Sequence, residues 1–394
     1  MSTIQNSELQ SNTSIFRKII SDSRSLGILL LLCTFLSLVL TNIKGIGTFY
    51  YNFWELEIPG FHQLHLPHSI IHFINDALMT LFFFHVAIDI KKEVTTGELS
   101  SPGRVMLPSI SALFGVAFPA LIFMTVTTGT AYTNGWAIPT ATDIAFTLGM
   151  ISLLGKAVPH SMKVFLTALA IIDDLCAILI IAVFYGSGLY LMWLVGVAAA
   201  AIVIFLINRY FHHKVVYIAT TVLALAMWYC MYRSGIHASF AGVILAFILP
   251  ISKMPPFERR LSLPVNFLIV PLFALANTSI FITPAAVSGL TSPLSIGIVL
   301  GLLVGKPLGI TLAVYLMVKL RLVKLSNVHW AQFIGVGILA GIGFTMSIFV
   351  SNLSFPEEKI YNDIAKLSVL IASVLAMIIG YIWLKGIYRE NKEV

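Results

Sequence analysis

Two carboxylates stand side by side in the middle of a long apolar stretch of this chain. Asp173 and Asp174 are adjacent within residues 164–185, which are otherwise almost wholly apolar. A charged side chain at the centre of a membrane costs at least about 2.5–3.5 kcal/mol, so each one is a candidate functional residue. Successive residues of a helix point about 100° apart, and the two carboxylates are therefore expected to have different partners.

Three more ionisable side chains lie within apolar stretches, namely Asp76, Asp143 and Lys306. Lys306 lies between Gly305 and Pro307 and is the one strongly basic side chain predicted at mid-membrane. A buried ammonium compensates a buried carboxylate, and we expect its partner to be one of the adjacent aspartates of the 164–185 stretch.

Other titratable groups lie nearer the predicted membrane boundaries. Asp89 and Glu93 stand beside Lys91 and Lys92 at one end of the second apolar stretch, which favours an interfacial charge cluster. His237 lies near the opposite boundary. An imidazole there is either a group that titrates near physiological pH or a hydrogen-bonded structural residue.

Two of the apolar stretches contain residues that interrupt helices. In residues 133–154, Pro139 removes a backbone donor close to Thr140, Thr142 and Asp143, which predicts a broken helix or a proline kink. Carbonyls freed by a break, together with a hydroxyl and a carboxylate, would form a hard-oxygen environment suited to small cations. In residues 331–351, four glycines within nine residues predict close helix packing or an unwound middle.

A pair of interrupted helices separated by about half the chain is the best sequence sign of a transport site between inverted repeats. The positive ends of the half-helices then require an anion and the negative ends a cation. Asp143 and Lys306 are available for these two places.

The composition shows what positions these groups. Of 394 residues, 58% are hydrophobic and 10% are charged, whereas soluble proteins carry roughly 25% charged residues. This excludes a soluble globular, disordered or nucleic-acid-binding chain. About 20 apolar residues span a bilayer as a helix. We predict an all-α membrane protein with twelve such helices, at residues 27–43, 70–90, 105–128, 133–154, 164–185, 188–208, 215–232, 236–250, 264–282, 297–318, 331–351 and 365–384.

The basic residues predict the orientation. Nineteen Lys and Arg fall on the side that carries both termini and four on the other, with Lys306 inside the tenth helix. Such an excess marks cytoplasmic loops, so both termini are expected in the cytoplasm. Residues 1–26 and 387–394 would be cytoplasmic tails flanking a transport domain at 27–386. In the outer loop 44–69, apolar and charged side chains alternate up to Pro59-Gly60, a pair of residues typical of turns. This pattern predicts a short extracellular β-hairpin or an irregular loop.

Five strings of this sequence occur in a specific order, namely INDALM at 74–79, GWAIPTATDIAF at 135–146, AIIDDL at 170–175, GKPLGI at 305–310 and GIGFTMSIF at 341–349. With these strings the chain resembles, over about residues 20–388, the NhaA-type sodium/proton antiporters of bacterial inner membranes. The resemblance implies that the fourth and eleventh helices are unwound and cross at the membrane centre, and that the protein is a homodimer held partly by the extracellular hairpin.

The resemblance also implies roles for particular residues. By position, ion and proton binding is assigned to Asp173, Asp174, Thr142 and Asp143, and Na+ or Li+ would be held by Asp174, Asp173 and Thr142. Lys306 would supply the buried counter-charge, and Asp76 would be an accessory acidic residue. The pH response is assigned to His237, Asp89 and Glu93. In such proteins Na+ or Li+ leaves the cytoplasm while more than one H+ enters, so the exchange is electrogenic. No cofactor is expected, and the partners are the transported ions and the lipid bilayer.

The sequence departs from the family pattern mainly where pH regulation is concerned. Asp89 stands where a glutamate is usual and Lys92 where an arginine is usual. The segment 251–263 is short, and we expect it to lack the acidic and histidine residues that precede the ninth helix in well-known members. These departures predict a changed pH set-point on an intact transport core.

Two other classes of protein also use buried carboxylates. A sodium-coupled organic solute symporter shares this architecture, but it should need an organic substrate before Na+ moves. An intramembrane aspartyl protease needs two carboxylates that share a proton. The chain has no Gly-x-Gly-Asp string, and its adjacent aspartates are expected to point apart, which argues against the protease.

Overall fold

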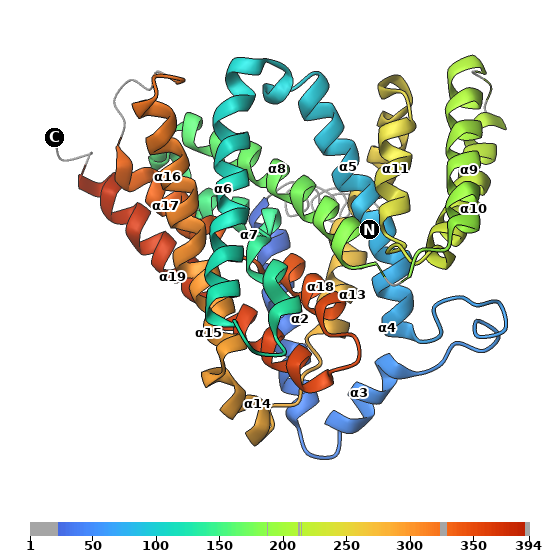
Figure 1. Cartoon of the computed structure of the whole chain (residues 1–394), viewed down its shortest axis with the longest axis horizontal. Helices are drawn as coiled ribbons and strands as arrows, with labels where there is room; N and C mark the ends of the chain where they lie inside the picture. The colour runs from blue at the N-terminus through green and yellow to red at the C-terminus, as the bar shows by residue number, and fades with distance from the viewer. Residues whose placement is uncertain (1–22, 187, 212, 214, 324–328, 391–394) are drawn as a thin grey trace, which may run out of the picture.

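The computed structural model describes residues 23–186, 188–211, 213, 215–323 and 329–390. Over these residues the chain is built from helices and contains no β-strand (Figure 1). The predicted tails fall largely outside the described residues. Their described parts, residues 23–26 and 387–390, belong to the first and last helices of the structure.

The helices follow one another with short connections. The first part of the chain forms α2 (Ser23–Asn42), α3 (Gly47–Glu55), α4 (Ile70–Phe73), η1 (Ile74–Leu78), α5 (Met79–Thr95), η2 (Glu98–Ser100), α6 (Pro102–Val126), η3 (Thr133–Thr140), α7 (Ile144–Leu153), η4 (Gly155–Ala157) and α8 (His160–Phe184). The middle part forms α9 (Leu191–Tyr210), α10 (Val215–Arg233), α11 (Phe240–Ile248), η5 (Ile251–Lys253), α12 (Pro255–Pro264), η6 (Val265–Ile269) and α13 (Val270–Asn277). The last part forms α14 (Pro284–Ser288), η7 (Gly289–Thr291), α15 (Pro293–Leu300), η8 (Gly301–Gly305), α16 (Lys306–Lys319), α17 (Trp330–Ala340), α18 (Phe344–Ser354) and α19 (Lys359–Glu390).

The described residues contain 10 helices long and apolar enough to cross a membrane, or 11 if the bent pair α17 and α18 forms one span. This defines a multi-pass helical membrane protein. Ten of the twelve predicted segments coincide with these helices, and the eleventh coincides with the bent pair. The full set of twelve spans is not confirmed, because the eighth segment differs.

The predicted span 236–250 is a short helix in the structure. Its helix α11 has 9 residues, which corresponds to about 14 Å and covers roughly half of a bilayer core. His237 and Ser239 form a turn before it, with 2.8 Å between the imidazole Nδ1 and the hydroxyl. Pro250 follows it, and the residue before a proline disfavours helical backbone. Apolar composition alone therefore overestimated the length of this helix.

Three spans contain one π-helical turn each, at η1, η6 and η8. A π turn holds an extra residue, so it shifts the side chains beyond it around the helix axis. Asp76 lies within η1, and Lys306 is the first residue after η8. Two of the ionisable residues singled out from the sequence are thus placed by irregular turns that the sequence pattern did not predict.

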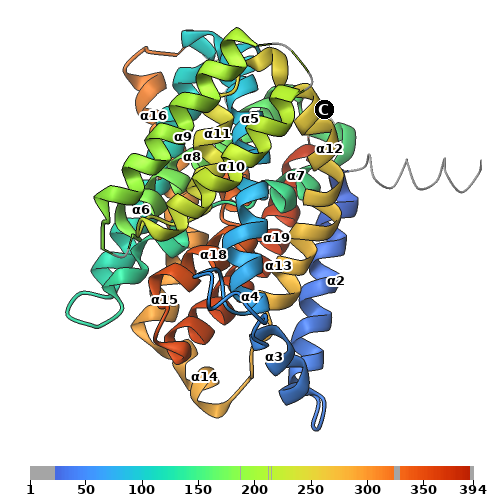
Figure 2. The same cartoon turned by 90° about the vertical axis from the view of Figure 1, so that its right-hand side faces the viewer.

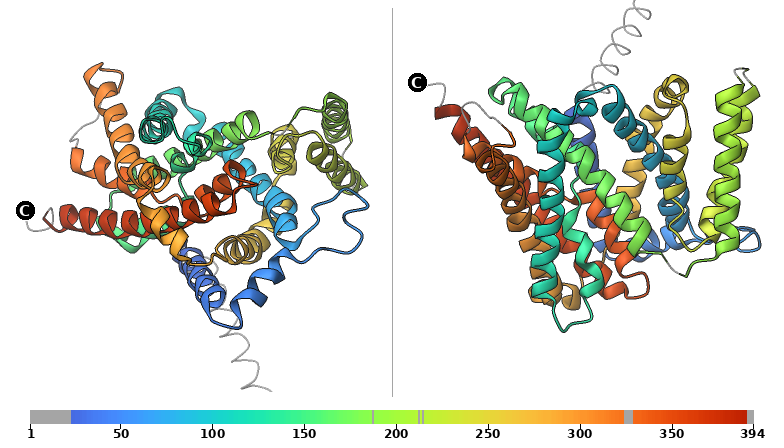
Figure 3. Two further views of the ribbon diagram at one scale, coloured as in Figure 1. Left: turned by 60° about the horizontal axis from the view of Figure 1, so that its bottom comes forward. Right: turned by 45° about the horizontal axis from the view of Figure 1, so that its top comes forward.

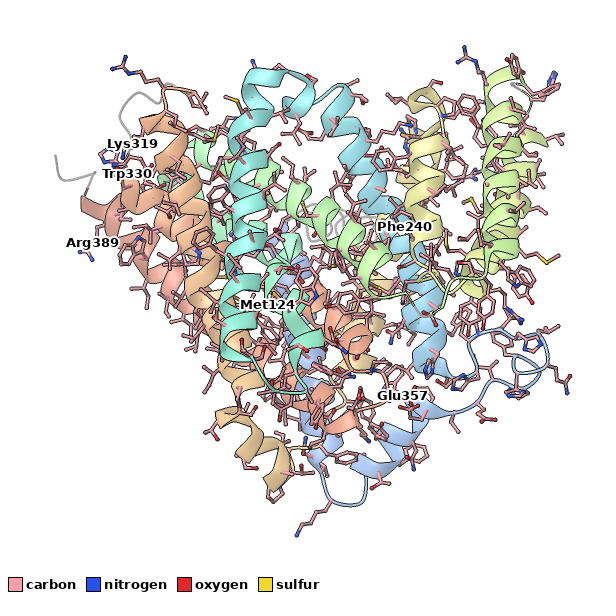
Figure 4. All side chains as sticks on the ribbon, in the orientation of Figure 1. Met124, Phe240, Lys319, Trp330, Glu357 and Arg389 are labelled. Carbon is pink, nitrogen blue, oxygen red and sulfur yellow. The ribbon has the colours of Figure 1, made fainter. Side chains whose placement is uncertain are left out.

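Different helices and connections lie at the two ends of the molecule. Figures 1 and 2 place α3 and α14 at the same end. Lys319, at the end of α16, and Glu357, in the connection after α18, lie toward opposite ends of the molecule (Figure 4). The helices α9 and α10 pack against each other at one edge of the molecule (Figures 1 and 3). Only 17% of the residues in the apolar part of α9, and 22% of those in the apolar part of α10, are buried.

The predicted β-hairpin at 44–69 is not confirmed. Residues 47–55 form helix α3, and the remainder of the loop makes a single isolated antiparallel bridge between Glu57 and Ser69. The Ile58 amide donates to the His68 carbonyl at 2.8 Å in this bridge. The alternation that predicted a strand begins at Phe53, which belongs to the last turn of α3 instead.

Close packing between α6 and α16 depends on Gly309. A β-carbon at this position would overlap the backbone carbonyl of Phe114. We expect Gly309→Ala to destabilise the protein by about 1–3 kcal/mol, the usual cost of overpacking, and to lower the thermal midpoint measured in detergent. Gly386→Ala in α19 is the control, because nothing lies within 4 Å of a β-carbon there. An unchanged midpoint for Gly309→Ala would contradict this packing.

Candidate functional site

The two interrupted helices meet at their interruptions. Residues 141–143 leave the helix between η3 and α7, and α17 and α18 form an angle of 50° at their own break. The Asp143 amide donates to the Ile342 carbonyl at 2.7 Å, and Thr142 Oγ1 donates to the Ala340 carbonyl at 2.7 Å. In the other direction, Ser347 Oγ donates to the Ile138 carbonyl at 2.7 Å. Each break therefore satisfies backbone groups that the other leaves without a helical partner.

The glycines of the eleventh segment serve both purposes that the sequence left open. Gly337 lies inside α17 and packs closely, since a β-carbon there would be 2.6 Å from the Cα of Pro307. Gly341 lies at the break, where a β-carbon would overlap the carbonyl oxygen of Leu302 in η8. The break thus packs directly on the turn that leads into Lys306.

Asp143 joins the N-termini of two helices. Its Oδ1 accepts from the Phe146 amide of α7 at 3.3 Å. Its Oδ2 accepts from the Thr345 amide of α18 at 3.0 Å and also from the Thr345 hydroxyl. An anion at a helix N-terminus is stabilised by the helix dipole, typically by about 0.3–1 kcal/mol. Asp143 therefore occupies the place that the sequence predicted for an anion.

Lys306 is fully buried and makes three hydrogen bonds. Its Nζ donates to both carboxylate oxygens of Asp173, at 2.8 and 2.7 Å, and to Thr142 Oγ1 at 2.9 Å. Because Thr142 in turn donates to the last carbonyl of α17, the positive charge also faces the negative end of that helix. Of the two aspartates that the sequence left as partners of Lys306, the structure selects Asp173.

Asp174 lies next to this pair without a counter-charge of its own. The residue is 3% exposed, and its Oδ1 has no hydrogen-bond partner among the described residues. The predicted divergence of Asp173 and Asp174 is thus seen in their surroundings. A buried oxygen without a partner costs free energy unless a proton or a cation satisfies it.

The charges of this group do not balance. Asp143, Asp173 and Asp174 bring three carboxylates together around one ammonium, that of Lys306. Asp173 is neutralised by Lys306, and Asp143 is stabilised by three donors. The charge of Asp174 is the one left for a mobile proton or cation. Na+ takes oxygen ligands, which in proteins come from carboxylates, hydroxyls and carbonyls.

Asp76 and His237 form a second group, which shares no hydrogen bond with the first. His237 Nε2 lies 3.3 Å from Asp76 Oδ1, and both line a cavity at the end of the molecule that carries α3. The sequence treated them as separate candidates with different roles. The structure brings them together but places them outside the hydrogen-bonded group of Lys306.

The predicted pH-response residues Asp89 and Glu93 lie toward the opposite end of the second span. Asp89 is 51% exposed, with its Oδ2 3.9 Å from His85 Nε2. Lys92 pairs with Glu258 at 2.7 Å. The expectation that segment 251–263 lacks acidic residues was therefore wrong, because Glu258 in α12 pairs with Lys92.

Several polar residues of the structure were missed by the sequence analysis. Four asparagines from four helices form a hydrogen-bonded chain. Asn277 Nδ2 donates to Asn75 at 2.8 Å, Asn352 donates to Asn277 at 2.6 Å, and Asn362 donates to Asn352 at 3.0 Å. A search for buried charges does not select the neutral amide side chains of asparagine. Thr345 was also missed, although a hydroxyl directly after the glycine break was a usable signal.

Broken helices that meet beside a buried acid–lysine group define a membrane transporter with its site at the helix interruptions. Residues 17–384 match the family described as Na+/H+ antiporter 1. The Na(+)/H(+) antiporter NhaA of Cytophaga hutchinsonii is 44% identical over 96% of this chain and 97% of its own. NhaA 2 of Flavobacterium johnsoniae is 44% identical over 97% and 95%, and NhaA of Dechloromonas aromatica 42% identical over 96% and 97%. The chain belongs to the NhaA family of Na+/H+ antiporters.

Proposed function

We propose that this protein exports Na+ or Li+ from the cytoplasm in exchange for more than one H+ per ion, by alternating access. The observation that carries the proposal is the unpartnered Oδ1 of Asp174 beside the salt bridge of Lys306 and Asp173. The site thus holds one carboxylate that needs a proton or a cation and a second that is held by an internal cation. Asp174 is the main cation ligand in this proposal, with Thr142 and Asp173 completing the set.

Competition for the same oxygens turns binding into exchange. A cation that enters the site stabilises the ionised carboxylate of Asp174 and expels its proton, whereas a proton neutralises that carboxylate and releases the cation. Asp173 either exchanges a second proton or pairs with Lys306, according to the state of the site. If the site opens to the two faces in turn, Na+ bound on one side leaves on the other as protons return.

The proposed direction and stoichiometry agree with the pH gradient and the membrane voltage that can drive such an exchange. Each pH unit supplies about 1.4 kcal/mol per proton. Each net charge moved across the membrane adds about 2.3 kcal/mol per 100 mV. A surplus of protons over cations therefore allows an interior-negative voltage to drive Na+ out of the cell with little pH gradient.

The setting and regulation of the protein belong to the same proposal. We place it in a bacterial inner membrane with both termini in the cytoplasm, because nineteen basic residues fall on that side in the predicted topology. Exchange is proposed to be pH-regulated through Asp89, Glu93 and His237, and the protein to be a homodimer. Asp89 and Lys92, which depart from the family pattern, predict that this protein has its own pH set-point.

The direct test uses purified protein in liposomes that hold a pre-formed pH gradient. Added Na+ or Li+ is expected to dissipate the gradient, reported by a pH-sensitive dye, without any organic solute. An interior-negative potential should accelerate Na+ efflux if more than one proton enters per ion. Measuring from about pH 6 to 9 brackets histidine titration and also gives the set-point.

The rival functions give different results in the same experiment. A sodium-coupled organic solute symporter would leave the gradient intact until an organic substrate is present. An intramembrane protease would cleave a membrane peptide and leave the pH unchanged. Either result would overturn the proposed exchange.

A further inference from the structure

The cavity that contains Asp76 and His237 has a volume of about 550 Å³. It is lined by residues of α3, η1, α13, α18 and α19 and of the turn before α11. We call it the outer cavity, because the loop that contains α3 is predicted to be extracellular.

The floor of the outer cavity lies close to the ion site. Phe349 of α18 lines the cavity and packs against Phe83, His237 and Phe273, with ring centroids 5.3, 5.1 and 6.1 Å away. Thr345, one helical turn earlier, donates to Asp143. One turn of helix is about 5.4 Å, so these packed rings separate the cavity from the broken helices by little more than a side chain.

Lys366 lies in the wall of this cavity and is unusual for a lysine. The topology predicted from sequence counts it among the outer basic residues, but it lies two turns inside α19, which begins at Lys359. Lys366 is 7% exposed, and its ammonium has no hydrogen bond or ion pair to any described residue. Buried lysines are almost always paired, because desolvating an unpaired charge is costly.

The charged groups around Lys366 leave its charge facing the cavity. Lys359 of the same cavity is exposed and stacks on the Tyr51 ring, with 3.9 Å from Nζ to the ring centroid. Glu55 accepts from the Tyr51 hydroxyl at 3.1 Å. Asp363, one turn before Lys366, lines the cavity as well and acts on Lys366 through its charge, yet the two form no salt bridge within the described residues. The charges of Asp363 and Glu55 offset part of the cost of desolvating the Lys366 ammonium without binding it directly.

We propose that Lys366 sets the affinity of the outward-facing protein for external Na+, by holding a positive charge in the wall of the cavity through which the cation leaves. The inference rests on the proposed exchange. A fixed ammonium repels a cation in the cavity and favours its release into an external medium that is rich in Na+. A cation that enters from the opposite face does not pass through this cavity, so we expect a smaller effect of Lys366 on its uptake.

The size of the effect follows from Coulomb's law. At an effective dielectric constant of about 20, a unit charge roughly 12 Å from a cation changes its binding constant about tenfold. Asp363 and Glu55 reduce this repulsion in part. We therefore expect removal of the Lys366 charge to lower the half-saturating concentration of external Na+ by about three- to tenfold.

The test compares the two faces of the membrane. Lys366→Met and Lys366→Gln are expressed in cells, and Na+-dependent proton exchange is measured in right-side-out and in everted vesicles. Both variants are expected to lower the half-saturating Na+ concentration at the extracellular face and to change it less than about twofold at the cytoplasmic face. Lys366→Arg, which keeps the charge, should retain the wild-type value.

Lys359→Met is the matched control, since it removes a lysine of the same cavity whose charge is exposed to solvent and therefore screened. An unchanged external value in both neutral variants, or an equal shift at the two faces, would overturn the role of Lys366. A wild-type protein that exchanges no Na+ for H+ would instead refute the proposed function. The two failures are thus distinguished within one set of vesicles.

Discussion

Asp174→Asn is expected to abolish sodium-dependent proton exchange, with a loss of at least about 100-fold in turnover. The variant keeps the size of the side chain but removes both the negative charge and the proton that is exchanged. Lys306 holds Asp173, and helix N-termini hold Asp143, so the variant leaves no carboxylate in the group without partners of its own. The measurement is dissipation of a pH gradient by Na+ and Li+ in proteoliposomes.

The same variant is expected to fold at least as stably as the wild type. Asp174 lies beside Asp173 in a buried site, so an amide there relieves like-charge repulsion. The thermal midpoint in detergent should therefore stay the same or rise while exchange is lost. Glu357→Gln serves as the control, because this exposed carboxylate lies in the connection after α18, outside the site, and the variant should keep its maximal exchange rate. Full exchange activity of the Asp174→Asn variant would contradict the assignment of Asp174 as the cation ligand.

The central group could be predicted from sequence because burying charge in a membrane is expensive. Asp173, Asp174, Asp143 and Lys306 stand out against an apolar background, and their cost requires that they meet or bind ions. The interruptions near Pro139 and at the four glycines could be predicted for a similar reason. Freed backbone groups at membrane depth must be satisfied within the protein, and the two breaks satisfy each other.

Features that depend on local geometry could not be predicted in the same way. Hydropathy does not distinguish the 9-residue helix α11 from a full span, since α11 itself is wholly apolar and the turn at His237 directly precedes it in the sequence. The π turns that position Asp76 and Lys306 have no composition of their own. Pairing partners such as Glu258 for Lys92 depend on how distant segments pack, which periodicity does not report.

The position of Lys366 is the clearest case of this limit. On sequence it is one of four basic residues on the outer side, and its place near a helix end suggests an interfacial anchor. The structure buries it at a cavity wall because α19 begins earlier than the apolar stretch does. A search for buried charge therefore finds the proposed ion site but misses a buried lysine in the wall of a neighbouring cavity.

Lys306→Met is expected to lower the free energy of unfolding by about 3–5 kcal/mol and to stop exchange. Removing the ammonium leaves Asp173 as a buried carboxylate without a counter-charge, and removing one partner of a buried pair usually costs this much. Thr142 also loses the ammonium that donates to it. The change is measured as a fall in the thermal midpoint, together with exchange in proteoliposomes.

Two comparisons isolate the cause of that loss. Lys92→Met breaks a lysine–carboxylate pair with the same 2.7 Å separation, but its partners are 39% and 29% exposed, so we expect a cost below about 1 kcal/mol. Lys306→Met combined with Asp173→Leu removes both buried charges and should recover most of the stability, because apolar replacement of a whole buried pair is often neutral. Exchange should stay absent in this double variant. A midpoint as low in the double variant as in Lys306→Met would show that lost packing, and not an uncompensated charge, causes the destabilisation.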